Sequence, residues 1–298
     1  MGSFFIGDLM YLEDFNDIFY MERALEIARE GTGKTKTNPL VGCVIVKDDK
    51  IIGQGAHLKF GENHAEVNAI LDAKSRGEDI RGATLYVNLE PCSHYGKTPP
   101  CAERIVKEGI RRVVIGTADP FEKVSGRGIK ILEDAGISVT EGLCEEECLN
   151  LNERFFTYLK NKRPFVVLKA GMSLDGKIAT ESGESQWITS EFSRAHGHEL
   201  RGQLDAIMVG IGTVLADNPT LNTRHGKYKN NPIRIITDSS LRIPLDAKVL
   251  SDDLDSIAII ATTESCDKDK LEKLKSMKNV EVIICKDKDK RVDLRDLM

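Results

Sequence analysis

Apolar residues follow two different spacings in the N-terminal part of the chain. Between residues 15 and 30 they recur every three or four positions, which predicts a helix that Gly31 and Gly33 end. Residues 41–46 form a continuous apolar run typical of a buried strand, and a polar turn leads from it to a second strand at 51–54. Another helix is predicted at 65–74. The chain therefore begins with a helix, two neighbouring strands and a second helix.

The alternation continues as far as a charged junction. Strands are predicted at 84–87, 113–116 and 138–140, and helices at 101–108, 129–135 and 145–159. Strands that alternate with helices indicate a layered α/β domain. The charged stretch that ends in Pro164 interrupts this pattern. We therefore predict a first domain over residues 1–160 and a second over residues 161–298.

The second domain repeats an α/β pattern. Strands are predicted at 165–168, 206–210, 233–237, 257–261 and 281–284, and helices at 190–201 and 268–276. The glycines Gly210 and Gly212 come between a strand and a short helix, where backbone N–H groups can meet a phosphate. The spacing is not the G-x-G-x-x-G fingerprint, so a Rossmann domain is not indicated.

Composition narrows the class of protein. The 298 residues carry a formal charge of −5 with a pI near 5.8, and only 6% are aromatic. Nucleic-acid binding usually needs a basic face and stacking aromatic rings. No apolar run approaches the roughly 20 residues that cross a bilayer, and residues 1–20 lack the basic start of a signal peptide. The seven scattered cysteines suit a reducing compartment. We expect a cytoplasmic protein that binds neither nucleic acid nor membrane.

One group of residues has the pattern of a catalytic metal site. His64 and Glu66 stand one residue apart at the start of a predicted helix, and Cys92 and Cys101 follow, the first of them after Pro91. Zinc deaminases have a similar pattern, H-x-E…P-C-x-x-C, in which the Glu moves protons and does not bind the metal. Three protein ligands leave zinc a position for water, whose pKa falls to about 7. We predict that His64, Cys92 and Cys101 bind Zn²⁺ and that Glu66 is the catalytic acid and base.

The other cysteines have a simpler interpretation. A buried lone cysteine usually acts as a small apolar residue, which we expect of Cys43, Cys144, Cys148, Cys266 and Cys285. A purely structural zinc site would have four ligands and no adjacent carboxylate. Glu66 therefore favours catalysis.

The segments around these residues resemble a known family. Thr37–Gly42, Gly53–His57, His64–Glu66 and the long insert Pro91–Cys101 are similar to the bifunctional deaminase–reductase of riboflavin biosynthesis. The second domain continues the likeness at Leu168–Ala179, Ser182–Thr189 and Val209–Pro219. The resemblance implies a cytidine-deaminase-like α/β/α sandwich followed by a dihydrofolate-reductase-like α/β domain. It also implies that the first domain deaminates diaminohydroxyphosphoribosylaminopyrimidine and that the second reduces the ribosyl group of the product to ribityl with NADPH.

The resemblance also implies roles for individual residues. Asn38 and His57 would face the pyrimidine, Lys97 its phosphate and Asp119 its ribose. NADPH would lie against Gly171, Trp187, Thr213, Asp217 and Ser239, and the reductase substrate against Ser185, Arg201, Leu221 and Arg224, with both arginines near its phosphate. Arginine's planar fork suits phosphate. The resemblance thus implies a phosphorylated pyrimidine as the small-molecule partner, and we expect a homo-oligomer.

Two departures from the family qualify this likeness. The family's Asp-Pro-Asn-Pro is here Asp119-Pro120-Phe121-Glu122, so Asp119 can still serve the ribose but the polar contact that the family's Asn would make is not expected. The family's closing Glu and Gly-rich segment cannot be placed before Met298. We therefore expect the reductase domain to be incomplete, either a truncated version of the family's or a degenerate one.

Three other functions remain open on the residues alone. The chain could be a deaminase only, with the C-terminal part a non-catalytic oligomerisation scaffold. A nucleic-acid-editing deaminase is a second alternative, against which the acidic composition argues. A non-enzymatic zinc module is a third, which would give Glu66 no chemical role.

Overall fold

The computed structural model describes residues 5–95, 99–120, 125–251, 253 and 255–298. The chain divides into two compact units, Met1–Phe165 and Val166–Met298. Each unit has its own hydrophobic core around its own sheet.

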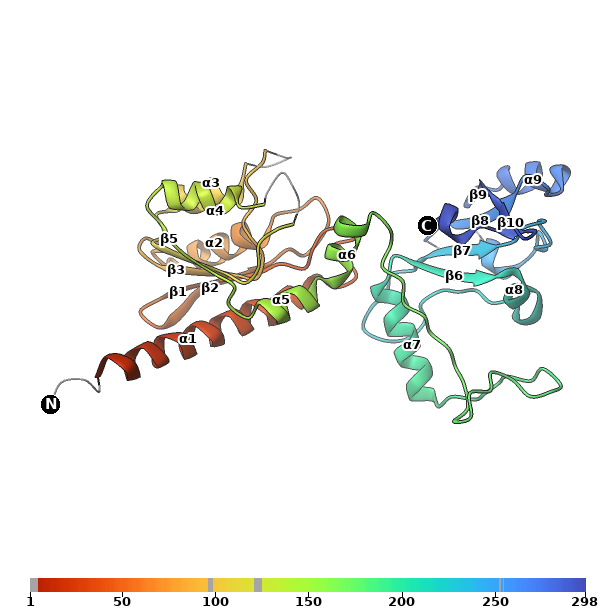
Figure 1. The fold of residues 1–298 in the computed structure, drawn as a ribbon, viewed down its shortest axis with the longest axis horizontal. Coiled ribbons are helices and arrows are strands. Elements are labelled where there is room, and N and C mark those ends of the chain that lie inside the picture. The colour runs from red at the N-terminus through yellow and green to blue at the C-terminus, as the bar shows by residue number, and fades with distance from the viewer. Residues whose placement is uncertain (1–4, 96–98, 121–124, 252, 254) are drawn as a thin grey trace. The chain divides into compact units, whose positions relative to one another are not determined.

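The first unit is built on a mixed five-stranded sheet (Figure 1). The strands lie in the order β2-β1-β3-β4-β5. β1 pairs antiparallel with both of its neighbours, whereas β3, β4 and β5 are parallel. The bounds are β1 Gly42–Lys47, β2 Lys50–Ala56, β3 Thr84–Val87, β4 Arg112–Ile115 and β5 Ser138–Glu141.

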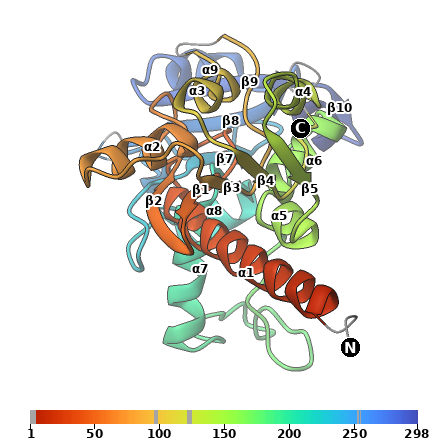
Figure 2. The same cartoon turned by 90° about the vertical axis from the view of Figure 1, so that its left-hand side faces the viewer.

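Helices cover both faces of this sheet, as Figures 1 and 2 show. Cys43 and Ile45 of β1 belong to the core under α2 (Ala65–Ser75), α3 (Cys101–Glu108) and α4 (Arg127–Asp134). Val44 and Val46 belong to the opposite core, under α1 (Phe5–Ala28) and α5 (Glu145–Leu151). Alternate strand residues point to opposite faces, and both faces are apolar here. The result is the expected three-layered α/β/α arrangement.

Two differences from the prediction concern helices. The first helix begins at Phe5, well before residue 15, and a 3-10 turn at Arg29–Gly31 follows its end at Ala28. The helix predicted over 145–159 is interrupted at Asn152, so that α5 is followed by α6 (Glu153–Asn161). Asn152 leaves the helical conformation, and its side chain binds the backbone of a distant loop.

The second unit contains a parallel four-stranded sheet in the order β6-β7-β8-β9. Its core includes Ile236 of β7 and Ile260 of β8, together with Val214 of α8 and Leu271 and Leu274 of α9. The strands are β6 Ala206–Gly210, β7 Ile233–Thr237, β8 Ala258–Thr263 and β9 Val280–Cys285, with the short pair β10 Asp287–Lys288 and β11 Arg291–Val292. The helices are α7 Glu191–Gln203, α8 Ile211–Asp217, α9 Lys268–Lys275 and α10 Leu294–Leu297, with a 3-10 turn at Lys248–Leu250.

The strand predicted at 165–168 is absent from the structure, and this prediction is wrong. Residues 164–173 have no regular secondary structure, and Leu168 and Leu174 are fully exposed. In Figure 1 the segment before α7 runs away from strands β6–β9. A strand needs hydrogen-bonding neighbours, and apolar composition alone does not supply them. The predicted strands at 206–210 and 233–237 have such neighbours and are found with those bounds.

No helix within the described ranges is long and apolar enough to cross a bilayer.

Candidate active site

Three predicted metal ligands meet in the first unit. The Nδ1 atom of His64 lies 3.5 Å from the Sγ of Cys92 and 3.4 Å from the Sγ of Cys101. All three donor atoms lie within 4.8 Å of one another. With standard Zn–N and Zn–S bond lengths, a tetrahedral ion separates such donors by roughly 3.6 Å. The donor set therefore fits one zinc ion that keeps a fourth position for water.

Two helix starts bring these ligands together. His64 is the N-cap of α2, in extended conformation, and Cys101 is the first residue of α3. Cys92 lies in the loop after β3, and its Sγ accepts a hydrogen bond from the Cys101 backbone N–H at 3.3 Å. The first N–H groups of a helix have no partner within the helix. Here one of them stabilises the thiolate form of a ligand.

The pKa values of the three ligands are shifted in different directions, which favours a Cys92 thiolate beside a protonated His64. The hydrogen bond with Cys101 is the largest factor that lowers the pKa of Cys92, to about 4. The hydrogen bond with Cys92 raises the pKa of His64 to about 9, and the pKa of Cys101 lies well above its usual range because of Cys92 and burial. The thiolate is the metal-binding form of cysteine. A metal ion that binds all three residues displaces their remaining protons.

Glu66 lies in the first turn of α2, two residues after His64. Its side chain is buried, and this burial raises its pKa to about 7. A carboxyl group with a pKa near neutrality can both accept and release a proton. Glu66 is therefore suited to proton transfer beside the metal centre.

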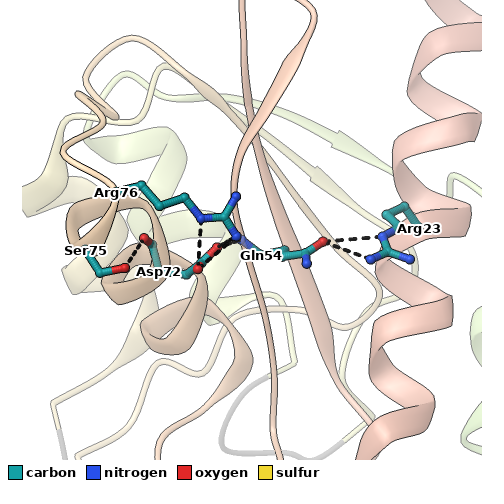
Figure 3. Close-up of polar contacts among 5 residues, drawn as sticks. All are labelled: Arg23, Gln54, Asp72, Ser75 and Arg76. Carbon is teal, nitrogen blue, oxygen red and sulfur yellow. Dashed lines mark hydrogen bonds and ion pairs between the residues drawn. The ribbon is translucent and has the colours of Figure 1, made fainter.

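Helix α2 is fixed against the edge strand β2 (Figure 3). The backbone N–H of Gln54 donates to Asp72 at 2.9 Å, and Arg76 forms an ion pair with Asp72 at 2.7 Å. The side-chain oxygen of Gln54 accepts from Arg23 on α1 at 3.1 Å. A Cβ at Gly55 would lie 2.5 Å from the backbone nitrogen of Ala69, so only glycine allows this approach. The position of His64 and Glu66 thus depends on close contact between backbones.

Asn38 and His57, predicted to face the pyrimidine, contact each other. The Nδ2 of Asn38 lies 3.1 Å from the Nε2 of His57, and the Nδ1 of His57 lies 3.0 Å from the carbonyl oxygen of Asn63. A carbonyl only accepts, so the His57 ring donates from Nδ1 and accepts at Nε2. Burial lowers the pKa of His57, which favours this neutral form. The orientation of the Asn38 amide is therefore fixed.

Two buried asparagines bind the backbone of the segment that follows Asn38. Neither was predicted from the sequence. The Asn152 side chain accepts from the Leu40 N–H at 2.7 Å and donates to its carbonyl at 2.9 Å. Asn88 donates to the same carbonyl at 3.0 Å and accepts from the Gly42 N–H at 2.8 Å. The sequence would have indicated a role for Asn152 only through the helix break at this residue, and the apolar spacing of 145–159 predicts one unbroken helix.

Asp119 is the fourth predicted contact of the deaminase substrate. Its side chain is buried near the end of β4, and its backbone N–H donates to the carboxylate of Glu90 at 3.1 Å. Lys97, which is predicted to contact the phosphate, and Phe121, which stands where the family has Asn, lie outside the described residues.

In the second unit the structure brings together three of the four predicted substrate residues. Arg201 on α7 donates to the Asn222 carbonyl at 2.6 Å, between the neighbouring Leu221 and Arg224. Burial and then the charge of Arg224 lower the pKa of Arg201. Two guanidinium groups that repel each other suit an anionic ligand. Ser185 lies instead on the irregular segment before α7.

The predicted cofactor residues lie in two regions. Thr213 and Asp217 are exposed on α8, directly after β6, and Ser239 follows β7. Both places are at the carboxyl ends of parallel strands, where open α/β sheets bind ligands. Gly171 and Trp187 lie on the irregular segment, and the exposed Trp187 ring stacks on Arg194 with 4.3 Å between guanidinium carbon and ring centroid. The structure does not place these two beside the other three.

Comparison with known families gives two matches that divide the chain. The family described as cytidine and deoxycytidylate deaminase zinc-binding region matches residues 15–117. The family described as RibD C-terminal domain matches residues 164–298. The matches agree with the zinc ligands in the first unit and with the α/β sheet of the second.

Curated relatives and solved structures cover most of the chain. The riboflavin biosynthesis protein RibD of Actinobacillus pleuropneumoniae is 50% identical over 282 residues, which are 95% of this chain and 73% of the relative. RibD of Aquifex aeolicus is 48% identical over 90% of this chain and 73% of its own length. The Thermotoga maritima diaminohydroxyphosphoribosylaminopyrimidine deaminase/5-amino-6-(5-phosphoribosylamino)uracil reductase superposes with a TM-score of 0.78 at 42% identity, over 91% of this chain and 81% of that one.

Proposed function

The chain belongs to the RibD family of riboflavin biosynthesis proteins, and on that premise we propose that its first unit deaminates diaminohydroxyphosphoribosylaminopyrimidine and its second reduces the product. The protein is a zinc-dependent deaminase and an NADPH-dependent reductase. The proposed substrate is supported by the cluster of the metal ligands His64, Cys92 and Cys101 with Glu66 beside it, in a chain that also has the family's second domain.

In the deamination step His64, Cys92 and Cys101 would hold the zinc ion. When bound, zinc lowers the pKa of a water molecule so that it attacks at neutral pH. Glu66 would take a proton from the attacking water and give it to a ring nitrogen as the new C–O bond forms. It would then carry the remaining hydroxyl proton to the amino group, which leaves as ammonia when the C–N bond breaks. One water is consumed and one ammonia is released. The Glu66 pKa of about 7 suits both directions of proton transfer.

The substrate would be oriented by four side chains. Both ring nitrogens of His57 are bound to protein groups, so His57 would face the pyrimidine with its ring and orient the Asn38 amide. The side-chain oxygen and second N–H of that amide offer an acceptor and a donor to the pyrimidine edge. Asp119 would meet the ribose and Lys97 the phosphate, to which its ammonium group is a compact counter-charge.

In the reduction step NADPH supplies a hydride, which is the cofactor's own chemistry. Arg201 and Arg224 would bind the substrate phosphate, with Ser185 and Leu221 along the rest of the molecule. Gly171, Trp187, Thr213, Asp217 and Ser239 would bind NADPH. For Gly171, Trp187 and Ser185 this requires the segment before α7 to lie against the sheet.

Ammonia release and NADPH oxidation test both half-reactions. The assay starts from the deaminase substrate with and without a zinc chelator, and each condition is repeated with NADPH. We expect ammonia only without the chelator, and NADPH oxidation only when ammonia has been formed. Absence of ammonia from the zinc-loaded protein would refute the proposed substrate.

The cellular setting belongs to the same proposal. We place the protein in the cytoplasm, as a homo-oligomer that acts on a small molecule and binds neither nucleic acid nor membrane. The support is the charge of −5 and seven cysteines that are all free thiols. We also propose a domain boundary between residues 160 and 161, five residues before the two structural units divide.

A further inference from the structure

Glu90 is a buried carboxylate that four backbone groups surround. Its Oε2 atom accepts from the N–H groups of Asp119 at 3.1 Å and Gly126 at 3.0 Å. Its Oε1 atom accepts from those of Gly128 at 2.9 Å and Ile129 at 3.4 Å. Only 3% of the residue is exposed. A carboxylate offers about four lone-pair sites, and these four donors fill them.

The same carboxylate caps helix α4. The N-cap residue Gly126 has no side chain, so Glu90 serves the first N–H groups of the helix from another segment. A negative charge at a helix N-terminus is also favoured by the helix dipole. The approach is tight, because a Cβ at Gly128 would overlap the carbonyl oxygen of Pro91.

Glu90 joins the metal centre to the Asp119 segment. It stands two residues before the ligand Cys92, and its own backbone N–H donates to the Thr117 carbonyl at 3.0 Å. Asp119 follows two residues after Thr117 and donates its backbone N–H to the Glu90 side chain. The position of Asp119 relative to the metal is therefore set by Glu90 through two hydrogen bonds.

We propose that Glu90 is a positioning residue for deamination, which fixes the Asp119 carboxylate against the substrate bound at the zinc centre. The proposal rests on the proposed function of the first unit. It requires a carboxylate, because glutamine would replace one acceptor oxygen by an amino group that faces two N–H donors. Glu90→Gln therefore leaves two of the four buried donors without an acceptor, either those of Asp119 and Gly126 or those of Gly128 and Ile129, and weakens the attachment of the backbone that carries Asp119.

The test is a double-mutant cycle on ammonia release, with Glu90→Gln, Asp119→Ala and the combined variant, all loaded with zinc. We expect Glu90→Gln to raise KM roughly 10- to 100-fold, with a smaller change in kcat and an unchanged zinc content. Since Glu90 acts through Asp119, the combined variant should be no more than about twofold worse than the worse single variant. Zinc content and the thermal unfolding of the first unit are the folding controls, and NADPH oxidation with the wild-type deaminase product should not change.

Several outcomes would overturn the proposal. An unchanged KM in Glu90→Gln, an unaffected Asp119→Ala or multiplicative effects in the combined variant each mean that Glu90 does not act through Asp119. If Glu90→Gln does not fold or loses zinc, the cycle is repeated with Glu90→Asp, which keeps the charge, and the same outcomes decide. Failure of the wild-type chain to release ammonia would instead refute the proposed function itself.

Discussion

The two candidate sites of this chain are held in different ways. In the first unit the ligands and substrate residues lie at helix starts and strand ends, and buried side chains such as Asn88, Glu90 and Asn152 bind the loops between them. In the second unit the arginines are fixed beside Asn222, but Gly171 and Trp187 lie on a segment with mainly local hydrogen bonds. The residues of the first site are therefore already in place, whereas those of the second are only partly so. Because each site is built from residues of its own unit, the two activities should respond independently to most changes.

Metal removal should separate the two sites most strongly. A chelator that strips zinc from His64, Cys92 and Cys101 should abolish ammonia release, because the metal is what lowers the pKa of the attacking water. NADPH oxidation with the pre-formed product should continue at its original rate. Added zinc should restore ammonia release. Equal loss of both activities on chelation would mean that the units are not independent.

Glu66→Gln should have the next largest effect. The amide cannot carry a proton, and general acid–base catalysis contributes about 10²- to 10⁴-fold. We expect kcat for deamination to fall by that factor while zinc content and NADPH oxidation stay unchanged. Glu78→Gln, an exposed change in the same region, is the matched control. A fall in zinc content in Glu66→Gln would contradict a role in proton transfer alone.

The difference between the two sites also explains what could be predicted from sequence. The zinc ligands and Glu66 lie in two short motifs whose residue types have few other uses together. Glu90 and Asn152 bind backbone groups 29 and 112 residues away along the chain, and no local pattern indicates such partners. The strand predicted at 165–168 failed for a related reason, because an apolar run does not say which strand will pair with it.

Arg201→Ala should impair only the second site. The variant removes a charged donor from the proposed phosphate site, and hydrogen bonds to charged groups contribute about 1.5–3 kcal/mol. We expect KM for the reductase substrate to rise roughly 10- to 100-fold, with ammonia release unchanged. Arg234→Ala is not a suitable control because that side chain is fully buried, so Arg242→Ala serves instead. If the KM for NADPH rises and the KM for the substrate does not, Arg201 belongs to the cofactor site.

Asp17→Asn should affect stability and neither activity. Asp17 on α1 accepts from the Tyr86 hydroxyl at 2.6 Å and from both terminal nitrogens of Arg112 at 3.0 and 2.6 Å. The arginine is partly exposed, so we expect a loss of about 1–3 kcal/mol. Thermal unfolding of the first unit measures it, with the exposed pair variant Asp134→Asn as control. An unchanged midpoint would show that this network does not fasten α1 to the sheet.

Trp187→Ala should have the smallest effect on stability and is the sharpest test of the second site. The ring is 69% exposed and contacts Arg194, so its removal should change the free energy of unfolding by no more than about 0.5 kcal/mol. If the segment before α7 closes on NADPH, the same variant should raise the KM for NADPH several-fold, because the ring then packs against the cofactor. Ammonia release, which depends on the other unit, should not change. An unchanged KM for NADPH would remove Trp187 from the cofactor site and leave Thr213, Asp217 and Ser239, at the carboxyl ends of the parallel strands, as its candidates.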